Sequence, residues 1–253
     1  MIRLNSLFML ALFVSQPAYS FSDLGHKMVA AIAWQKLTPY AKQNVERILG
    51  SGEKRFINAS VWADHIKSDE RFNYLKPLHY VNMPKQALVY DRKQDCKKDK
   101  CAVQAIHTFS NVLVNGKNKD KQLALRMLIH ILADLHQPLH AGLREDRGGN
   151  WYEVKYQDTN LSLHKFWDNQ LVKRMNLDWQ DAPSQLKVND HSIKLGKPEL
   201  WAQESHRIAI NQVYQVEENS LIGEQYLEMA DELIKSRVSI AGWRLGMWLN
   251  KLW

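Results

Sequence analysis

A histidine and an aspartate four residues apart, inside an apolar helical segment, constrain this chain more than any other feature. They are His130 and Asp134, in the helix-forming segment 120–137 that precedes Pro138. A spacing of four places both side chains on one face of a helix. The neighbouring residues are Leu, Ile and Met, so both polar groups point into a core and need partners there.

The same residue types recur at four other places. His164 and Asp168 repeat the spacing of four on one helical face. His140 extends the first block: it follows Asp134 by six residues, after Pro138, and the turn can fold it back toward the same site. Three shorter blocks complete the set: Leu24-Gly25-His26, Trp62-Ala63-Asp64 and Leu78-His79-Tyr80.

Together the blocks supply imidazole and carboxylate groups without thiolate, which is the usual ligand set of catalytic zinc. Five histidines and three aspartates are too many for one tetrahedral ion, but they suffice for two or three ions if one carboxylate bridges. Any single pair is more commonly a hydrogen-bonded pair or a chance match. The occurrence of five blocks in one chain is what favours a metal centre.

Residues 1–20 have the pattern of a secretory signal peptide. Arg3 supplies the positive charge, and residues 7–14 (LFMLALFV) form an apolar stretch too short to span a membrane. Ala18 and Ser20 are small residues at the positions that determine cleavage, which predicts a cut between Ser20 and Phe21. A buried first helix is the alternative. No later stretch is apolar enough to cross a bilayer, so we expect a soluble mature chain that is secreted or periplasmic.

Charge and cysteine content narrow the class of protein. Removal of residues 1–20 takes away Arg3 and lowers the formal charge from +7 to +6, which suits a polyanionic substrate or an acidic surface. Hydrophobic residues make up 45% of the chain, so it is not disordered by composition. Cys96 and Cys101 are the only cysteines; an exported chain favours a small disulfide loop, and a zinc site is the alternative.

The remaining signals describe one, mostly helical domain. Thr38 and Pro39 begin a helix that Gly50 can end. No internal repeat or long linker is visible. The other predicted elements are two helices at 199–215 and 224–250, a hairpin strand at 151–156 (WYEVKY) and a loop at 142–150.

The motifs follow one another in a definite order. They are Leu24-Gly25-His26, Trp62-Ala63-Asp64, Leu78-His79, His130-x-x-x-Asp134-x-x-Gln137-Pro138-Leu139-His140, Gly148-Gly149-Asn150 and Leu163-His164-x-x-Trp167-Asp168. This order resembles the S1/P1 nuclease family, which are exported zinc nucleases with three metal ions. The resemblance runs from Phe21 to the tail at 241–245 (AGWRL). It implies an all-α, single-domain helical bundle over 21–253, of the type shared by zinc phospholipase C and single-strand nucleases, with one short β-hairpin at most.

The resemblance also implies a ligand set for each of three zinc ions. One zinc takes Asp64, His79, His130 and Asp134. Asp134 bridges to a second zinc, which also takes His26 and the amino nitrogen and carbonyl oxygen of Phe21. The third zinc takes His140, His164 and Asp168. The family commonly begins with tryptophan, so Phe21 keeps an aromatic side chain but lacks the indole N–H. The pair Cys96 and Cys101 matches a disulfide loop of the family.

A mechanism is implied as well. The bridged zincs share a water and lower its pKa toward neutrality, and the third zinc stabilises the leaving 3′ oxygen, which gives 5′-phosphate products. Asp64 also orients the nucleophile, and Lys67 contacts a phosphate oxygen unless it is simply solvated. Tyr80 stacks on an unpaired base, and Asn82 and Asn150 bond its edge. The family more often has phenylalanine and aspartate at the first two positions, so base preference stays open.

The expected substrates are single-stranded DNA and RNA and 3′-mononucleotides, cleaved by a monomer that does not associate with membranes. Two alternatives fit parts of the pattern. A zinc phospholipase C shares the trinuclear helical scaffold but usually carries glutamate at the position of Asp168, and it lacks the Gly148-Gly149-Asn150 block. A non-catalytic zinc-binding protein would have saturated metal sites with no open position.

Overall fold

The computed structural model describes residues 21–187 and 192–253. Helices dominate it, as the all-α prediction requires, and the described strands form one antiparallel hairpin. The predicted signal peptide, residues 1–20, lies outside the described residues. In chain order the elements are α1 (Asp23–Lys36), α2 (Pro39–Leu49), α3 (Glu53–Ala59), α4 (Trp62–His65), η1 (Glu70–His79), α5 (Arg92–Asp95), η2 (Lys97–Asp99), α6 (Ala102–Asn115), α7 (Asn118–Asp134), η3 (Pro138–Ala141), β1 (Glu153–Tyr156), β2 (Thr159–Ser162), α8 (Leu163–Lys165), η4 (Phe166–Gln170), α9 (Leu171–Arg174), α10 (Ala182–Gln185), α11 (Pro198–Asn211), η6 (Val213–Gln215) and α12 (Glu224–Leu252).

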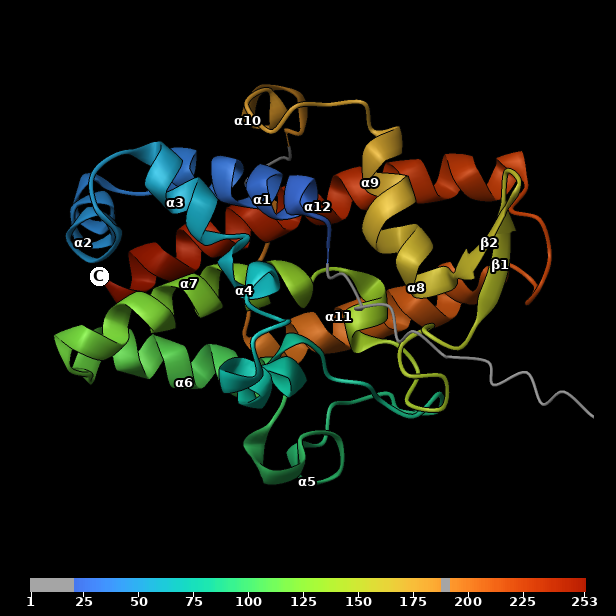
Figure 1. Cartoon of the computed structure of the whole chain (residues 1–253), viewed down its shortest axis with the longest axis horizontal. Helices are drawn as coiled ribbons and strands as arrows, with labels where there is room; N and C mark the ends of the chain where they lie inside the picture. The colour runs from blue at the N-terminus through green and yellow to red at the C-terminus, as the bar shows by residue number, and fades with distance from the viewer. Residues whose placement is uncertain (1–20, 188–191) are drawn as a thin grey trace, which may run out of the picture.

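The first and last long helices, α1 and α12, pack against each other (Figure 1). Two glycines of α12 make this close approach possible. A Cβ at Gly242 would lie 2.5 Å from the Cβ of Ile32, and one at Gly246 would lie 2.9 Å from the carbonyl oxygen of Ala33. Both distances are too short for any side chain, so the glycines fix how deeply α1 is buried.

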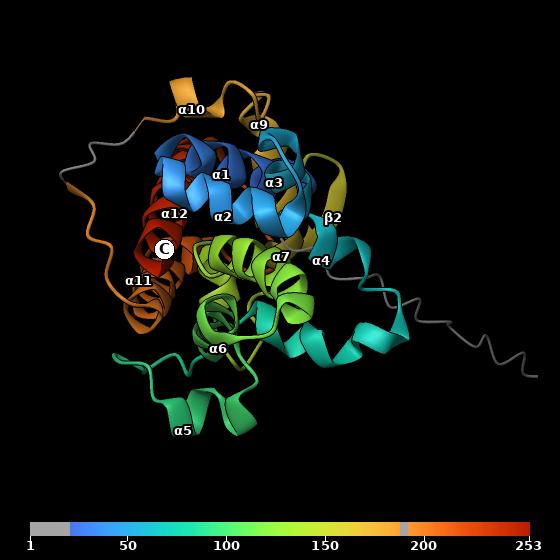
Figure 2. The same ribbon diagram turned by 90° about the vertical axis from the view of Figure 1, so that its left-hand side faces the viewer.

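Helix α7 lies at the centre of the bundle. It contacts α1, α2, α3, α4, α6 and α12, and Figure 2 shows it between the layer of α1, α2 and α3 and the lower helix α6. Every residue from Met127 to Asp134 is buried. The predicted helix at 120–137 is therefore present, but it ends at Asp134, and Pro138 begins the 3-10 turn η3 instead of stopping α7 directly.

The chain after α7 runs back beside the segment that follows η1. The amide of Val81 donates to the carbonyl oxygen of His140 over 2.8 Å, and the amide of Met83 donates to that of Gly142 over 3.1 Å. A bridge between Met83 and Leu143 extends this pairing. The pairing places the end of η1 beside the turn after α7, although the two segments lie about sixty residues apart in the sequence.

The helical run from α8 to α9 contains a wider turn. The predicted hairpin is present, with β1 paired to β2, and α8 follows β2 directly. The five residues of η4 form a π-helical turn before α9 continues the helix. Such turns occur often at functional sites because they displace side chains from the regular helical positions. Asp168 lies in this turn and is buried.

Other local predictions are confirmed. The hydroxyl of Thr38 caps α2 by accepting from the amide of Ala41 over 3.2 Å, and Gly50 ends the helix with φ of 93°. Cys96 and Cys101 form a disulfide at the start of α6. Within the described residues no helix combines the length and the apolar character that a membrane span needs.

Candidate metal centre

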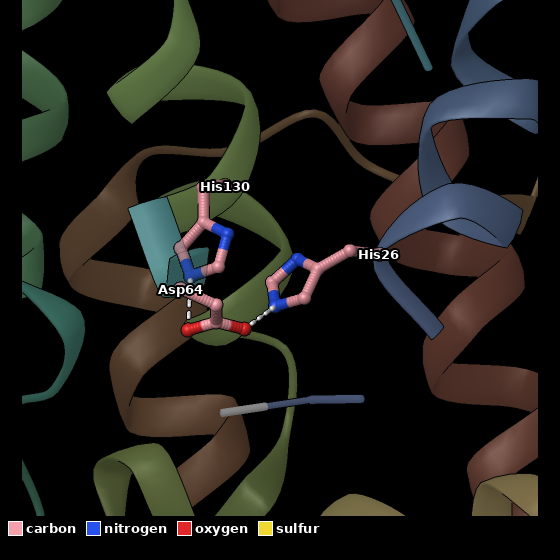
Figure 3. Close-up of side chains that lie close together, drawn as sticks. All are labelled: His26, Asp64 and His130. Carbon is pink, nitrogen blue, oxygen red and sulfur yellow. Dashed lines mark ion pairs between the residues drawn. The ribbon is translucent and has the colours of Figure 1, made fainter. Parts of the chain in front are cut away.

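Three side chains from three elements meet at the first part of the site. His26 comes from α1, Asp64 from α4 and His130 from α7, and their side chains point toward one another (Figure 3). The Nε2 atom of His26 lies 3.9 Å from Oδ2 of Asp64, and Nε2 of His130 lies 3.5 Å from Oδ1 of the same carboxylate. A ligand atom of each residue lies within 4.8 Å of the others, which is close enough to share one metal ion.

Asp134 uses both carboxylate oxygens within this cluster. Its Oδ1 lies 3.3 Å from Nε2 of His26. Its Oδ2 lies 3.2 Å from Nε2 of His130 and 2.8 Å from Nδ1 of His79. His79, His130 and Asp134 form a second group that can hold a metal ion, and His130 belongs to both groups. Asp134 therefore contacts His26 of the first group as well as both histidines of its own group.

A third group adjoins these two. Nε2 of His140 lies 3.6 Å from Oδ1 of Asp168, and Nε2 of His164 lies 3.0 Å from Oδ2. The third group joins the others through Asp134, whose Oδ1 is 3.7 Å from Nδ1 of His140. The structure thus brings together into one cluster all the histidines and aspartates that the sequence singled out as ligands, and all of them are buried except Asp64, which is half-buried.

Backbone carbonyl groups orient three of the histidines. Each presents Nδ1 to a carbonyl oxygen and leaves Nε2 facing the carboxylates: His130 to Ser60 (2.6 Å), His140 to His79 (2.8 Å) and His164 to Gly148 (2.6 Å). Such partners fix the ring orientation and the tautomer of metal-binding histidines. The Gly148-Gly149-Asn150 block thus acts first as a support for His164.

Gln137 has a role that sequence reasoning did not assign, although it lies inside the quoted motif. Its Nε2 donates to Oδ1 of Asp168 over 2.7 Å, and its Oε1 accepts from the amide of Leu139 over 2.5 Å. Gln137 therefore holds the turn after α7 against the π-helical turn η4. Its place one residue before Pro138, between two ligands, is the signal that could have revealed it.

The cluster fits a set of divalent cations. Oδ1 of Asp134, Oδ2 of Asp168 and Nε2 of His140 are buried, and their contacts with other atoms of the cluster lack hydrogen-bond geometry. Buried polar atoms nearly always have partners, so these three atoms need further ones. Imidazole and carboxylate donors without thiolate match the preference of catalytic zinc.

The carboxylates are held in their ionised form. Burial raises the pKa of Asp64, but His130 and Lys67 beside it outweigh burial and bring the pKa to about 2. Burial also raises the pKa of Asp134, but the neighbouring His130 and His140 outweigh burial and hold this pKa well below the usual range. Both groups are therefore available as anionic ligands at neutral pH.

The histidines divide into two kinds. Burial lowers the pKa of His79 to about 4, so its ring is neutral at pH 7. Burial also acts to lower the pKa of His140, but Asp134 and Asp168 outweigh it and raise the pKa to about 9. Without a cation, His140 therefore carries a proton at pH 7. Cation binding has to displace this proton, because only the neutral ring is a ligand.

Phe21 lies beside this centre. Its side chain is 1% exposed, and its ring is 6.1 Å from that of His26 in an edge-on arrangement. The ring occupies the place of a side chain at Gly25, where any Cβ would collide with it. The amide of Ser22 donates to the carbonyl oxygen of Asp168 over 2.9 Å. Gly25 thus leaves the space in which the ring of Phe21 packs.

Of the predicted substrate-binding residues, Tyr80 and Asn82 lie on the segment after η1, and Asn150 lies in the loop between η3 and β1. Tyr80 is 42% exposed, as a ring that stacks on a base must be. Oδ1 of Asn82 is buried and makes no hydrogen bond, and a Cβ on Gly148 would lie 3.0 Å from it. The amide of Asn150 donates to the carbonyl oxygen of Arg147 over 2.9 Å.

Lys67 pairs with Asp64 at 2.5 Å between Nζ and Oδ1, and its side chain is 18% exposed. The other histidines of the described residues belong to none of the three groups. His136 and His206 are buried and bond backbone carbonyl oxygens, whereas His65 is exposed beside Asp23. His191 lies outside the described residues.

The model of the family described as S1/P1 nuclease matches residues 21–253. The chain belongs to the S1/P1 nuclease family. Among the relatives of this S1/P1 nuclease is Nuclease S1 of Aspergillus oryzae, 26% identical over 269 residues that cover 94% of this chain and 93% of the relative. Endonuclease 2 of Arabidopsis thaliana is 26% identical over 275 residues, covering 95% and 93%. Nuclease P1 of Penicillium citrinum is 24% identical over 262 residues, covering 90% and 96%.

Membership of the S1/P1 nuclease family confirms the resemblance seen in the motifs and supports hydrolysis of phosphodiester bonds as the activity. The match covers nearly the whole chain and begins at Phe21. The motif residues His130, Asp134, His164 and Asp168 therefore belong to a nuclease scaffold. The phospholipase C alternative receives no support from the family match.

Proposed function

We propose that this chain is an exported zinc nuclease that hydrolyses single-stranded DNA and RNA to 5′-phosphate products. The same centre would also remove the phosphate group from 3′-mononucleotides. The observation that carries the proposal is the buried cluster in which Asp134 joins three His/Asp groups, within a chain of the S1/P1 nuclease family.

The proposal assigns three zinc ions to the cluster. The first ion takes Asp64, His79, His130 and Asp134; the second takes Asp134, His26 and the terminal amino and carbonyl groups of Phe21; the third takes His140, His164 and Asp168. When bound, zinc supplies Lewis-acid catalysis and lowers the pKa of water for attack on phosphorus. All these ligands come from one chain, so the proposed centre is complete in a monomer.

Residues of the chain supply the remaining charge and orientation. Asp64 stays ionised, since its pKa is about 2, and can orient the attacking water as well as bind an ion. Lys67 lies at the same carboxylate with part of its side chain exposed, so it can contact a phosphate oxygen. Together they place one fixed anion and one cation at the edge of the cluster.

Tyr80, Asn82 and Asn150 form the proposed base pocket. Tyr80 directly follows the ligand His79, and its exposed ring offers a stacking surface to an unpaired base. Asn82 lies half-buried two residues further on, and its amide group can bond a base edge. A duplex hides these base edges and faces, so the pocket selects single strands.

Export is the route by which Phe21 would gain a free amino group. Cleavage between Ser20 and Phe21 would leave the domain 21–253, which is the range that the family model matches. The disulfide between Cys96 and Cys101 suits an oxidising compartment. The mature protein would then be secreted or periplasmic.

The test is a cleavage assay with the chain from Phe21 to Trp253, loaded with zinc. We expect release of mononucleotides and short fragments with 5′-phosphate ends from single-stranded DNA and RNA, and of inorganic phosphate from 3′-mononucleotides. Phosphatidylcholine serves as the control substrate. Hydrolysis of the lipid without cleavage of either nucleic acid would contradict the proposal.

A further inference from the structure

A small cavity lies beside the metal centre, where α2, α3, α4 and α7 meet. Figure 2 shows α2, α3 and α7 as neighbours on one side of the bundle. The cavity has a volume of about 130 Å³. Its lining residues are Leu49, Arg55, Asn58, Ala59, Trp62 and Arg126.

The cavity holds two positive charges that nothing in the described residues balances. Arg126 is half-buried, and its guanidinium lies 5.1 Å from the centre of the Trp62 ring, which fixes its direction. Arg55 is exposed at the rim. Within residues 21–187 and 192–253, neither guanidinium forms an ion pair, and no carboxylate lines the cavity. Burial lowers the pKa of Arg126, as expected for a cation that lacks a counter-ion.

The size and chemistry of the cavity define its ligand. A volume of about 130 Å³ is several times that of a water at ~30 Å³ and accommodates a tetrahedral oxyanion. Guanidinium groups bind phosphate oxygens through paired N–H donors, and the amide of Asn58 adds another donor at the rim.

The position of the cavity connects it to the substrate. Arg126 precedes His130 by one helical turn on the same face of α7, a rise of about 6 Å. Trp62 precedes Asp64 by two residues in α4. The cavity therefore adjoins the metal cluster through both elements that supply its first ligands.

We propose that Arg55, Arg126 and Asn58 bind a backbone phosphate of the substrate strand, next to the nucleotide that is being cleaved. The inference rests on the proposed function and deepens it by adding a second contact to the strand. A strand that reaches this cavity is held at two points, whereas a dinucleotide is too short to use both.

The test compares substrates of two lengths. The variants are Arg55→Gln, Arg126→Gln and the double variant, with Arg207→Gln on α11 as the matched control, because Arg207 is exposed and lines no part of the cavity. The measured quantity is kcat/KM on a strand of about twenty nucleotides divided by kcat/KM on a dinucleotide, together with its salt dependence. We expect this ratio to fall about tenfold in the double variant. The slope of log kcat/KM for the long strand against log salt concentration should become shallower by about 0.7, the value for one lost phosphate contact. A ratio equal to that of Arg207→Gln would overturn the proposal.

Two further measurements separate a failed proposal from a misfolded variant or an inactive chain. Arg126→Lys keeps the charge but loses the paired donors, so its ratio should lie between those of the wild type and Arg126→Gln.

In amide NMR spectra, an oligonucleotide and inorganic phosphate should each shift the side-chain signals of Asn58 and Trp62 in the wild type but not in the double variant. Shifts with inorganic phosphate alone would overturn the assignment to the strand. If the wild type cleaves neither substrate, the proposed function is wrong. The cavity proposal is tested separately by NMR: if the oligonucleotide does not shift the signals of Asn58 and Trp62, that proposal is wrong as well.

Discussion

Asp134 is the residue on which the proposed metal centre depends most, because its two oxygens lie within 3.7 Å of histidines from four different segments. We predict that Asp134→Asn loses zinc and lowers the rate of strand cleavage more than about 100-fold, since an amide neither bridges two cations nor balances their charge. Zinc content by elemental analysis and cleavage rate are measured on the same sample. Asp120→Asn, on the exposed start of the same helix, is the control. A variant Asp134→Asn with full zinc content and wild-type turnover would remove Asp134 from the centre.

Phe21 acts through its backbone in the proposed centre, so its amino group should matter more than its side chain. The free amine has a pKa near ~8 and must lose its proton to bind zinc. One added residue before Phe21 converts the amine into an amide, a poor ligand. We predict that the extended chain folds, holds one zinc fewer and loses most of its activity. The control carries the same residue after Trp253. Equal zinc content and equal rates in both forms would exclude the amino group from the mechanism.

At the scale of elements, a buried polar network fixes the end of α7. Arg237 and Arg244 of α12 both pair with Glu204 of α11, the second pair at 2.7 Å. Nε of Arg237 donates to the carbonyl oxygen of His136 over 2.9 Å, and Nη1 of Arg244 lies 3.0 Å from Nε2 of the same residue. His136 stands two residues after Asp134, so the network holds the turn between the ligands on α7 and His140.

This network makes stability depend on pH. Burial raises the pKa of Glu204, but Arg237 and Arg244 outweigh burial and bring it to about 2 from 4.5. Because the pKa of Glu204 is lower in the folded state, its ionised carboxylate stabilises the fold. This contribution to the free energy of unfolding is fully present above pH 4.5 and is lost as the pH falls toward 2. We predict that Glu204→Gln lowers the free energy of unfolding by ~3 kcal/mol at pH 7 and by much less at pH 3. Urea unfolding at both pH values measures this difference. A difference that does not change with pH would contradict the assignment.

The sequence predicted the elements that local rules define. The ends of α2 follow from Thr38 and Gly50, and the pairs four residues apart on α7 and at His164 do meet. It did not predict that Asp168 lies in a π-helical turn, because that turn depends on the packing of neighbouring elements. Residue spacing alone could not place His79 beside Asp134, which only the family resemblance implied, since this contact depends on backbone pairing between distant segments.

The proposed base pocket would give the whole molecule a preference for single strands. Opening a duplex to reach Tyr80 costs energy that an unpaired strand does not require. We predict faster cleavage of a single strand than of the same sequence as a duplex, at equal phosphate concentration. Asn150→Ala should weaken nucleotide binding and retain zinc. Equal rates on both substrates would count against the role of Tyr80 and Asn150.

The central claim is that zinc in the Asp134 cluster drives strand cleavage, and a zinc titration tests it most directly. The chain from Phe21 to Trp253 is stripped of metal with a chelator and then titrated with zinc while cleavage of single-stranded DNA is followed. We predict no cleavage without metal, and activity that rises to a plateau as the third zinc per chain binds. Full cleavage by the metal-free chain would contradict the account.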